Sequence, residues 1–150
     1  MKRLVLDTEL LVFWIVGNLD PKRIGARRLE SFSPSNLERL NEIVKGYEVH
    51  VSTPNILTEA SNFIGSGKQQ LCKNGCAALG NYISKLEEVY VPSRTTLQSP
   101  MFASFGLADA TLFELASKRQ GDIWTVDGPL FGRLVNSGVP VSNFWHEVVL

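Results

Sequence analysis

The sequence predicts an α/β fold in which the strands of a mainly parallel sheet alternate with helices. Two short apolar runs, at residues 3–7 and 122–126, have the nearly continuous hydrophobic pattern of strands that are buried on both faces of a sheet. Segments with a helical spacing of apolar residues lie between the expected strands. Since the chain has 150 residues and no internal repeat or linker, we expect residues 1–150 to form one domain.

The individual elements follow from apolar spacing and from the positions of glycine and proline. Gly17 and Gly46 are typical of helix ends, Pro54 is typical of a helix start, and the run from Gly65 to Gly67 is typical of a helix break. We therefore expect strands at residues 3–7, 48–52, 88–91, 122–126 and 139–141, and helices at residues 10–16, 35–45, 55–64, 69–86, 107–118 and 129–135.

The overall composition narrows the class of protein. Hydrophobic residues make up 44% of the chain and charged residues 20%, as in ordinary soluble globular proteins. The 15 basic and 15 acidic side chains cancel, which argues against a protein that coats nucleic acid by bulk charge. Residues 1–17 are apolar after Lys2 and Arg3, but Asp7 and Glu9 interrupt the run. We therefore expect no signal peptide and no membrane span, and a cytoplasmic location.

Two acidic residues stand at the ends of predicted strands. Asp7 ends the run at residues 3–7, and Asp127 directly follows the strand at residues 122–126. An exposed surface position is the simplest interpretation of any single acid. In open α/β sheets, however, ligands bind at the carboxyl ends of the strands, where the strand order reverses. Matching acids at two strand ends therefore indicate a shared site.

Two further acids fall on the apolar faces of predicted helices. Glu59 shares a helical face with Ile56 and Phe63, at spacings of three and four residues. Asp109 is followed at the same kind of spacing by apolar residues such as Leu112. A carboxylate that faces the core is costly unless a cation or hydrogen-bond donors compensate its charge. Glu59 and Asp109 are therefore candidate site residues rather than ordinary surface acids.

Together these four acids predict a metal site. Few basic residues lie near them in the sequence, and close carboxylates without cations raise one another's pKa and destabilise a fold. Magnesium and manganese prefer hard oxygen ligands such as carboxylates. A site for Mg²⁺ or Mn²⁺ made by Asp7, Glu59, Asp109 and Asp127 would activate water and stabilise charge during hydrolysis of a phosphodiester.

The residues around the four acids also resemble a known family. The segments LVLDT at residues 4–8, LTE at 57–59, GLADA at 106–110 and TVD at 125–127 are similar, in this order, to the PIN domain. The similarity is greatest to the VapC-like ribonuclease toxins and their relatives, and it covers essentially the whole chain. The resemblance implies a three-layer sandwich whose five-stranded, mainly parallel sheet has the strand order 3-2-1-4-5.

The resemblance also implies an activity and a set of roles. It implies a magnesium- or manganese-dependent endoribonuclease that hydrolyses RNA, with a homodimer and, for the toxins, an antitoxin protein as partner. The four acids inherit the metal-binding and catalytic roles, and Thr8 and Thr125 inherit supporting hydrogen bonds. Glu9 departs from the pattern, because relatives often carry a small polar residue such as asparagine there. Glu9 would either add a ligand to the site or face solvent at a helix start, where the helix dipole favours an anion, and we expect the second.

Basic residues offer weaker candidates for phosphate contacts. Arg23, Arg27 and Arg28 follow the helix that leaves Asp7, and Arg133 lies in the helix that follows Asp127. A solvated basic surface is the simpler interpretation of such a run, but these side chains are candidate phosphate ligands. Two cysteines, at positions 72 and 76 of one predicted helix, lack the further ligands of a zinc site and are expected to pack as small apolar residues.

Two alternative functions follow from the same pattern. A phosphohydrolase of the haloacid dehalogenase type also has an aspartate after its first strand, but it needs a second aspartate two residues later, where this chain has Glu9. A non-catalytic PIN-like scaffold that binds RNA or protein is the other alternative. The presence of all four acids argues against the scaffold, because an inactive site has no reason to keep buried charges.

Overall fold

Five parallel strands form the central sheet of the protein, in the order β3-β2-β1-β4-β5. The computed structural model describes residues 1–148 of the chain. All pairings between neighbouring strands are parallel, so the predicted sheet and its strand order are confirmed. The strands are β1 (Arg3–Leu6), β2 (Val49–Ser52), β3 (Glu87–Glu88), β4 (Asp122–Thr125) and β5 (Ser142–Asn143).

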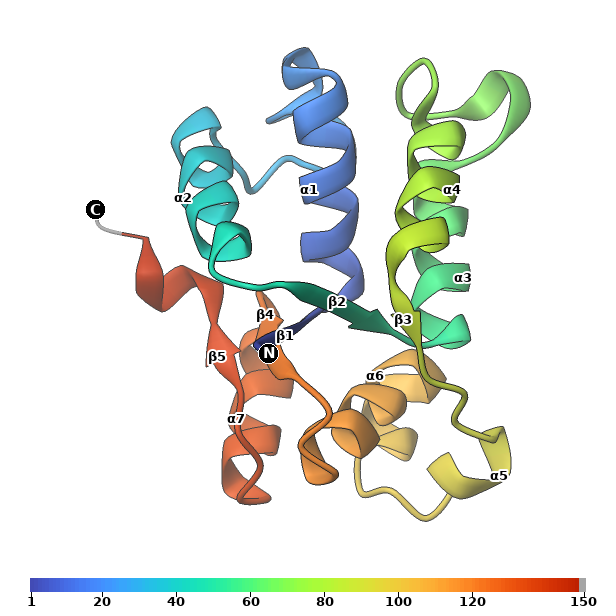
Figure 1. Cartoon of the computed structure of the whole chain (residues 1–150), viewed down its shortest axis with the longest axis vertical. Coiled ribbons are helices and arrows are strands. Elements are labelled where there is room, and N and C mark those ends of the chain that lie inside the picture. The colour runs from blue at the N-terminus through green and yellow to red at the C-terminus, as the bar shows by residue number, and fades with distance from the viewer. Residues whose placement is uncertain (149–150) are drawn as a thin grey trace.

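Helices cover both faces of this sheet and give the molecule three layers (Figure 1). The described residues form seven α-helices: α1 (Thr8–Leu19), α2 (Pro34–Lys45), α3 (Pro54–Ile64), α4 (Gly75–Lys85), α5 (Ser93–Thr96), α6 (Phe102–Ser117) and α7 (Gly128–Asn136). Helices α1 to α4 lie on one side of the sheet, in the upper part of Figure 1, and α5 to α7 lie on the other side. The predicted three-layer α/β architecture is therefore confirmed.

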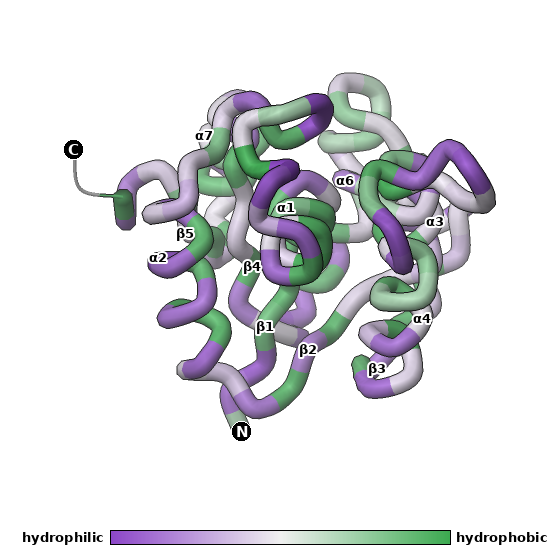
Figure 2. The backbone as a smooth tube through the Cα atoms, turned by 90° about the horizontal axis from the view of Figure 1, so that it is seen from above, coloured by the Kyte–Doolittle hydropathy of each residue, from purple (hydrophilic) through white to green (hydrophobic). Residues whose placement is uncertain are grey.

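The first strand and the first helix form the centre of the core. Leu4, Val5 and Phe13 are fully buried, and α1 contacts α2, α3 and α4. In Figure 2, β1 and α1 lie near the middle of the molecule and are largely hydrophobic. Burial thus explains why residues 4–6 and 10–16 are largely apolar. No helix among the described residues is both long enough and apolar enough to cross a membrane.

The end of α1 and the start of α4 lie several residues from their predicted positions. Gly17 does not end α1, which continues to Leu19. A Cβ atom at Gly17 would lie 3.3 Å from the ring of Phe13 and 3.4 Å from Leu37, so this glycine allows close packing of α1 against α2. The helix expected at residues 69–86 begins only at Gly75, and Asn74 before it has a left-handed backbone with φ of 67°.

The late start of α4 follows from local contacts of the preceding loop. The side-chain oxygen of Gln70 accepts a hydrogen bond from the backbone N–H of Cys76 at 2.7 Å. The backbone N–H of Leu71 donates to the carbonyl of Ile64, at the end of α3. These bonds hold residues 70–74 outside the helix, so the prediction that Cys72 and Cys76 share one helix is wrong. Cys72 is buried, whereas Cys76 is exposed.

The two outer strands are short and displaced from their predicted positions. Strand β3 consists of Glu87 and Glu88, and the expected strand at residues 88–91 is shortened where the chain leaves the sheet before Pro92. Strand β5 begins at Ser142 rather than at residue 139, because Pro140 has no N–H to donate to a sheet. The short helix α5 was not predicted.

Helix α6 contains a break that bears on the site described below. Gly106 has φ of 86° and ψ of −174°, outside the helical region, so the helix restarts at Leu107. This restart coincides with the predicted start of the helix at residues 107–118. Backbone with these angles is essentially restricted to glycine, which accounts for the residue at this position.

Candidate functional site

Asp7 directly follows β1 and caps the first turn of α1. Its side chain is only 4% exposed. One carboxylate oxygen accepts a hydrogen bond from the N–H of Leu10 at 2.8 Å, and the other accepts bonds from the N–H of Val126 at 2.9 Å and the hydroxyl of Thr125 at 2.5 Å. Burial raises the pKa of Asp7 to about 6, although these hydrogen bonds favour the charged form and act in the opposite direction. The carboxylate is therefore fixed in one orientation.

Asp127 holds the equivalent position after β4. Because β1 and β4 are neighbouring parallel strands, their carboxyl ends meet at one edge of the sheet. The fully buried hydroxyl of Thr125 links the two strand ends, since it donates to Asp7 and accepts a bond from the N–H of Asp127 at 3.0 Å. Asp127 in turn accepts a hydrogen bond from the N–H of Leu130 at 2.9 Å and so caps α7.

Glu59 and Asp109 come from two helices that pack against each other, α3 and α6. A buried hydrogen bond of 2.9 Å between the hydroxyls of Thr53, the N-cap of α3, and Thr111 of α6 joins these helices. Both acids are half-buried. No described residue donates a hydrogen bond to the carboxylate of Asp109, in contrast to that of Asp7.

The charges of the other three predicted acids act on Asp109. The pKa of Asp109 is raised to about 7, first by burial and then by the negative charges of Asp7, Glu59 and Asp127, with Glu9 contributing as well. Burial also raises the pKa of Glu9, and the charges of Asp127 and Glu59 add to this effect. We call these five acids, which are linked by these electrostatic effects, the acidic cluster.

Glu9 is the member of the acidic cluster that the sequence did not assign to the site. It is exposed in the first turn of α1, as expected, but its interaction with Asp127 and Glu59 also makes it part of the cluster. The sequence signal that could have assigned Glu9 to the cluster is its position two residues after Asp7. The positive charge of Arg28 lowers the pKa of Glu9, so Arg28 is near the cluster as well.

The remaining predicted residues have different surroundings. Thr8 is buried, and its hydroxyl has no hydrogen-bond partner in the part of the chain that the structure describes. Arg23 lies 3.6 Å from Asp20 in an ion pair, and Arg133 donates to the carbonyl of Pro100 at 3.3 Å. Arg27 is exposed, and the guanidinium of Arg28 stacks on the ring of Phe63. Arg28 is the arginine whose positive charge acts on Glu9 of the acidic cluster.

The chemistry of the acidic cluster fits a divalent cation. All its side chains offer hard carboxylate oxygens, and the carboxylate of Asp109 and the hydroxyl of Thr8 have no protein hydrogen bonds among the described residues. Within residues 1–148, no three His, Cys, Asp or Glu side chains already surround a common metal position. Magnesium usually binds through one or two carboxylates and keeps several waters, so it does not need such a shell.

A second surface lies away from the acidic cluster. A cavity of about 740 Å³ opens between α1, α2, α4 and β2, and we call it the aromatic groove because Trp14, His50 and Tyr82 line it. The ring centroids of Trp14 and His50 are 5.2 Å apart, and the Tyr82 hydroxyl lies 3.0 Å from Nδ1 of His50. Burial lowers the pKa of His50. None of the five acids lines this groove.

No family model matches the chain, and no curated protein matches it either. Its class is therefore defined by fold and site. The protein has an α/β fold with five parallel strands in the order 3-2-1-4-5. Its distinguishing feature is an acidic cluster at the edge of the sheet where the carboxyl ends of β1 and β4 meet.

Proposed function

We propose that this protein is a metal-dependent endoribonuclease with a PIN-like fold. The observation that carries the proposal is the position of the acidic cluster. Strand order reverses between β1 and β4, which is where open α/β sheets bind their ligands. Asp7 and Asp127 follow these two strands, and their charges, together with that of Glu59 in α3, raise the pKa of Asp109 in α6. A half-buried group of acids with so little compensating positive charge favours a site for Mg²⁺ or Mn²⁺.

The side chains divide into ligands and positioning residues. Asp7, Glu59, Asp109 and Asp127 would hold the metal through their carboxylate oxygens, and Thr125 orients Asp7 by its hydrogen bond. When bound, a divalent cation supplies a Lewis acid that activates water and stabilises charge on the phosphodiester. Asp109, whose raised pKa leaves part of its population protonated near neutral pH, would exchange its proton for the metal. The proposed hydrolysis involves no covalent enzyme intermediate.

The PIN-like assignment adds three parts to the proposal. The substrate is RNA, the protein is cytoplasmic, and it forms a homodimer. If it is the toxin of a toxin–antitoxin pair, its remaining partner is an antitoxin protein. The four acids, their order along the chain and the strand order of the sheet support this assignment.

Cleavage of a labelled single-stranded RNA tests the proposal. The parent protein should cut the RNA in magnesium or manganese. Cleavage should stop in excess chelator and should resume when either metal is restored. Asp109→Asn should be inactive under all three conditions, while Glu38→Gln, an exposed acid on α2, should retain full activity. Full activity in chelator, with no residual metal in the protein, would show that cleavage does not use the proposed metal site.

A non-catalytic scaffold is the second candidate function, and the aromatic groove favours it. A cavity of about 740 Å³ with an aromatic lining has the size and character of a binding site. If the protein is a scaffold, it should cut no RNA in any metal. A partner bound in the aromatic groove should protect Trp14 from solvent. The fluorescence of Trp14 in a variant that lacks the other two tryptophans would report such binding.

A further inference from the structure

Arg28 has an unusual setting for an exposed arginine. Its guanidinium carbon lies 4.0 Å from the ring centroid of Phe63, close enough for a strong cation–π contact. Its backbone has φ of 73°, a left-handed conformation that is uncommon for residues other than glycine. Non-glycine residues in this region persist only where the surrounding structure fixes them, and they concentrate at functional sites.

The loop around Arg28 explains how this conformation is maintained. Leu29, the next residue, is fully buried. Its N–H donates to the carbonyl of Ala26 at 2.8 Å, and its carbonyl accepts a bond from the N–H of Gly25 at 2.9 Å. With Leu29 anchored in the core, the backbone directs the side chain of Arg28 to the surface and onto Phe63. The guanidinium is therefore held in place without an ion pair in the described part of the chain.

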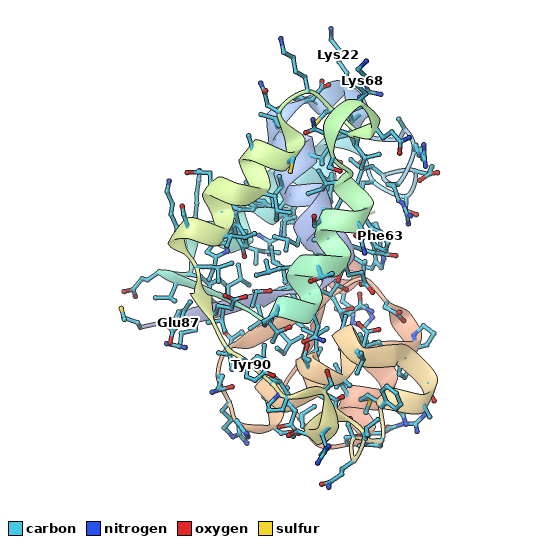
Figure 3. The ribbon with its side chains drawn as sticks, turned by 90° about the vertical axis from the view of Figure 1, so that its right-hand side faces the viewer. Lys22, Phe63, Lys68, Glu87 and Tyr90 are labelled. Atoms are coloured by element: carbon cyan, nitrogen blue, oxygen red, sulfur yellow. The ribbon has the colours of Figure 1, made fainter. Side chains whose placement is uncertain are left out.

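This held cation lies beside the acidic cluster. Phe63 follows Glu59 by four residues in α3, so the two side chains share one face of the helix, one turn apart. Figure 3 shows Phe63 on the flank of α3 that is turned away from α4. The charge of Arg28 also acts on Glu9, the exposed acid of the cluster. Arg28 is thus at the border of the proposed metal site.

A guanidinium stacked by one face keeps its N–H edge available to oxygen ligands, and that edge matches the geometry of a phosphate. We propose that Arg28, held by Phe63, is a subsite that binds one backbone phosphate of a single-stranded RNA next to the position of cleavage. This subsite deepens the proposed nuclease function and rests on it. The metal site would act on one phosphate, and Arg28 would bind another phosphate of the same strand and set its direction. Arg28 is therefore a positioning residue.

The salt dependence of binding tests this subsite directly. The affinity for a fluorescein-labelled oligouridylate is measured in magnesium between about 50 and 300 mM salt, with every variant made in the non-cleaving Asp109→Asn protein. For single strands, the slope of log affinity against log salt changes by about 0.7 for each phosphate contact. Arg28→Ala should therefore lower the slope by about 0.7 and weaken binding by about tenfold.

Three further variants separate the effect of the Arg28 charge from the effect of its contact with Phe63. Arg28→Gly removes the side chain but suits the left-handed backbone. It should therefore show the same lower slope even where the alanine protein is poorly folded. Phe63→Leu should keep the slope and weaken binding by about two- to fivefold, because the charge remains but is no longer held. Arg27→Ala, the matched control, removes an exposed arginine of the same loop and should leave the slope unchanged.

The outcomes distinguish this inference from the nuclease proposal. An unchanged slope in both Arg28 variants, an equal loss in Arg27→Ala, or no measurable binding of the strand would overturn the subsite. A lower melting temperature of Arg28→Ala with an unchanged slope would show that Arg28 only offsets the charge of the acids. If the slope falls as expected but the parent protein cuts no RNA in either metal, the subsite is supported and the nuclease proposal fails.

Discussion

Replacing Asp109 by asparagine removes one charge from the acidic cluster and keeps the shape of the side chain. The pKa of Asp109 is raised from 3.8 to about 7, chiefly by burial and then by the neighbouring carboxylates. Each tenfold change in an ionisation constant corresponds to about 1.4 kcal/mol. The ionised carboxylate therefore destabilises the folded protein by up to about 4 kcal/mol. Since the side chain is only half-buried, water screens part of this effect, and the value is an upper bound.

Proton linkage gives the sign of the effect. The folded protein keeps a proton on Asp109 up to about pH 7, whereas the unfolded chain loses it near pH 3.8. The free energy of unfolding of the parent therefore falls as the pH rises through this interval and then levels off. The amide of the Asp109→Asn variant does not titrate, so the variant lacks this loss. Parent and variant should have similar stability near pH 4 and differ most near pH 8.

Thermal melts of both proteins, with chelator and with manganese, provide the assay. In chelator near pH 8, the variant should be more stable by up to about 4 kcal/mol, or roughly 8–16 °C in Tm. Manganese at one hundred times its dissociation constant should stabilise the parent by about 2.7 kcal/mol and the variant by less. Glu38→Gln, an exposed acid outside the cluster, should change neither result. A less stable variant in chelator, with an equal response to manganese, would refute the reasoning and make Asp109 a structural residue.

Three other substitutions have matched comparisons. Asp7→Asn should be less stable than Asp109→Asn in the same melts, because its amide N–H₂ would face groups that donate hydrogen bonds to Asp7. Thr125→Val should lose about 1–3 kcal/mol in urea unfolding, whereas Thr125→Ser keeps the hydroxyl and should retain most of the stability. Gly106→Ala should lose about 1–3 kcal/mol in urea unfolding. Gly80→Ala, at a helical position with open space, should gain up to about 1 kcal/mol. Equal stabilities within a pair would contradict the assigned role.

The central strands could be predicted because their signal is local. Both β1 and β4 are buried on both faces, so each is a nearly continuous apolar run, and the acid that ends each run is visible in the sequence. The outer strands have no such signal. Strand β3 consists of two exposed glutamates, and only the pairing of Val51 with Glu87 and of Ser52 with Glu88 makes it a strand. Long-range pairing of this kind leaves no periodic pattern.

For the candidate site too, only the local signals could be read from the sequence. The four acids could be selected because each breaks a strand or helix pattern. The link between Asp7 and Thr125 could be expected only from a resemblance, since it depends on the register of β1 and β4. The contact of Arg28 with Phe63 joins a loop to a helix far away in the sequence, and a left-handed arginine has no signal in the sequence at all.

The break in α6 has a consequence for how the acids are tolerated without an ion. Because the helix restarts after Gly106, Asp109 lies in the first turn of a helical segment, while Asp7 and Asp127 are the N-caps of α1 and α7. A helix start carries partial positive charge and free N–H groups, and it stabilises a nearby anion by about 0.3–1 kcal/mol. Three helix dipoles therefore supply part of the countercharge from the backbone itself. An ion that binds there would be an exchangeable ligand of a folded protein rather than a requirement for folding.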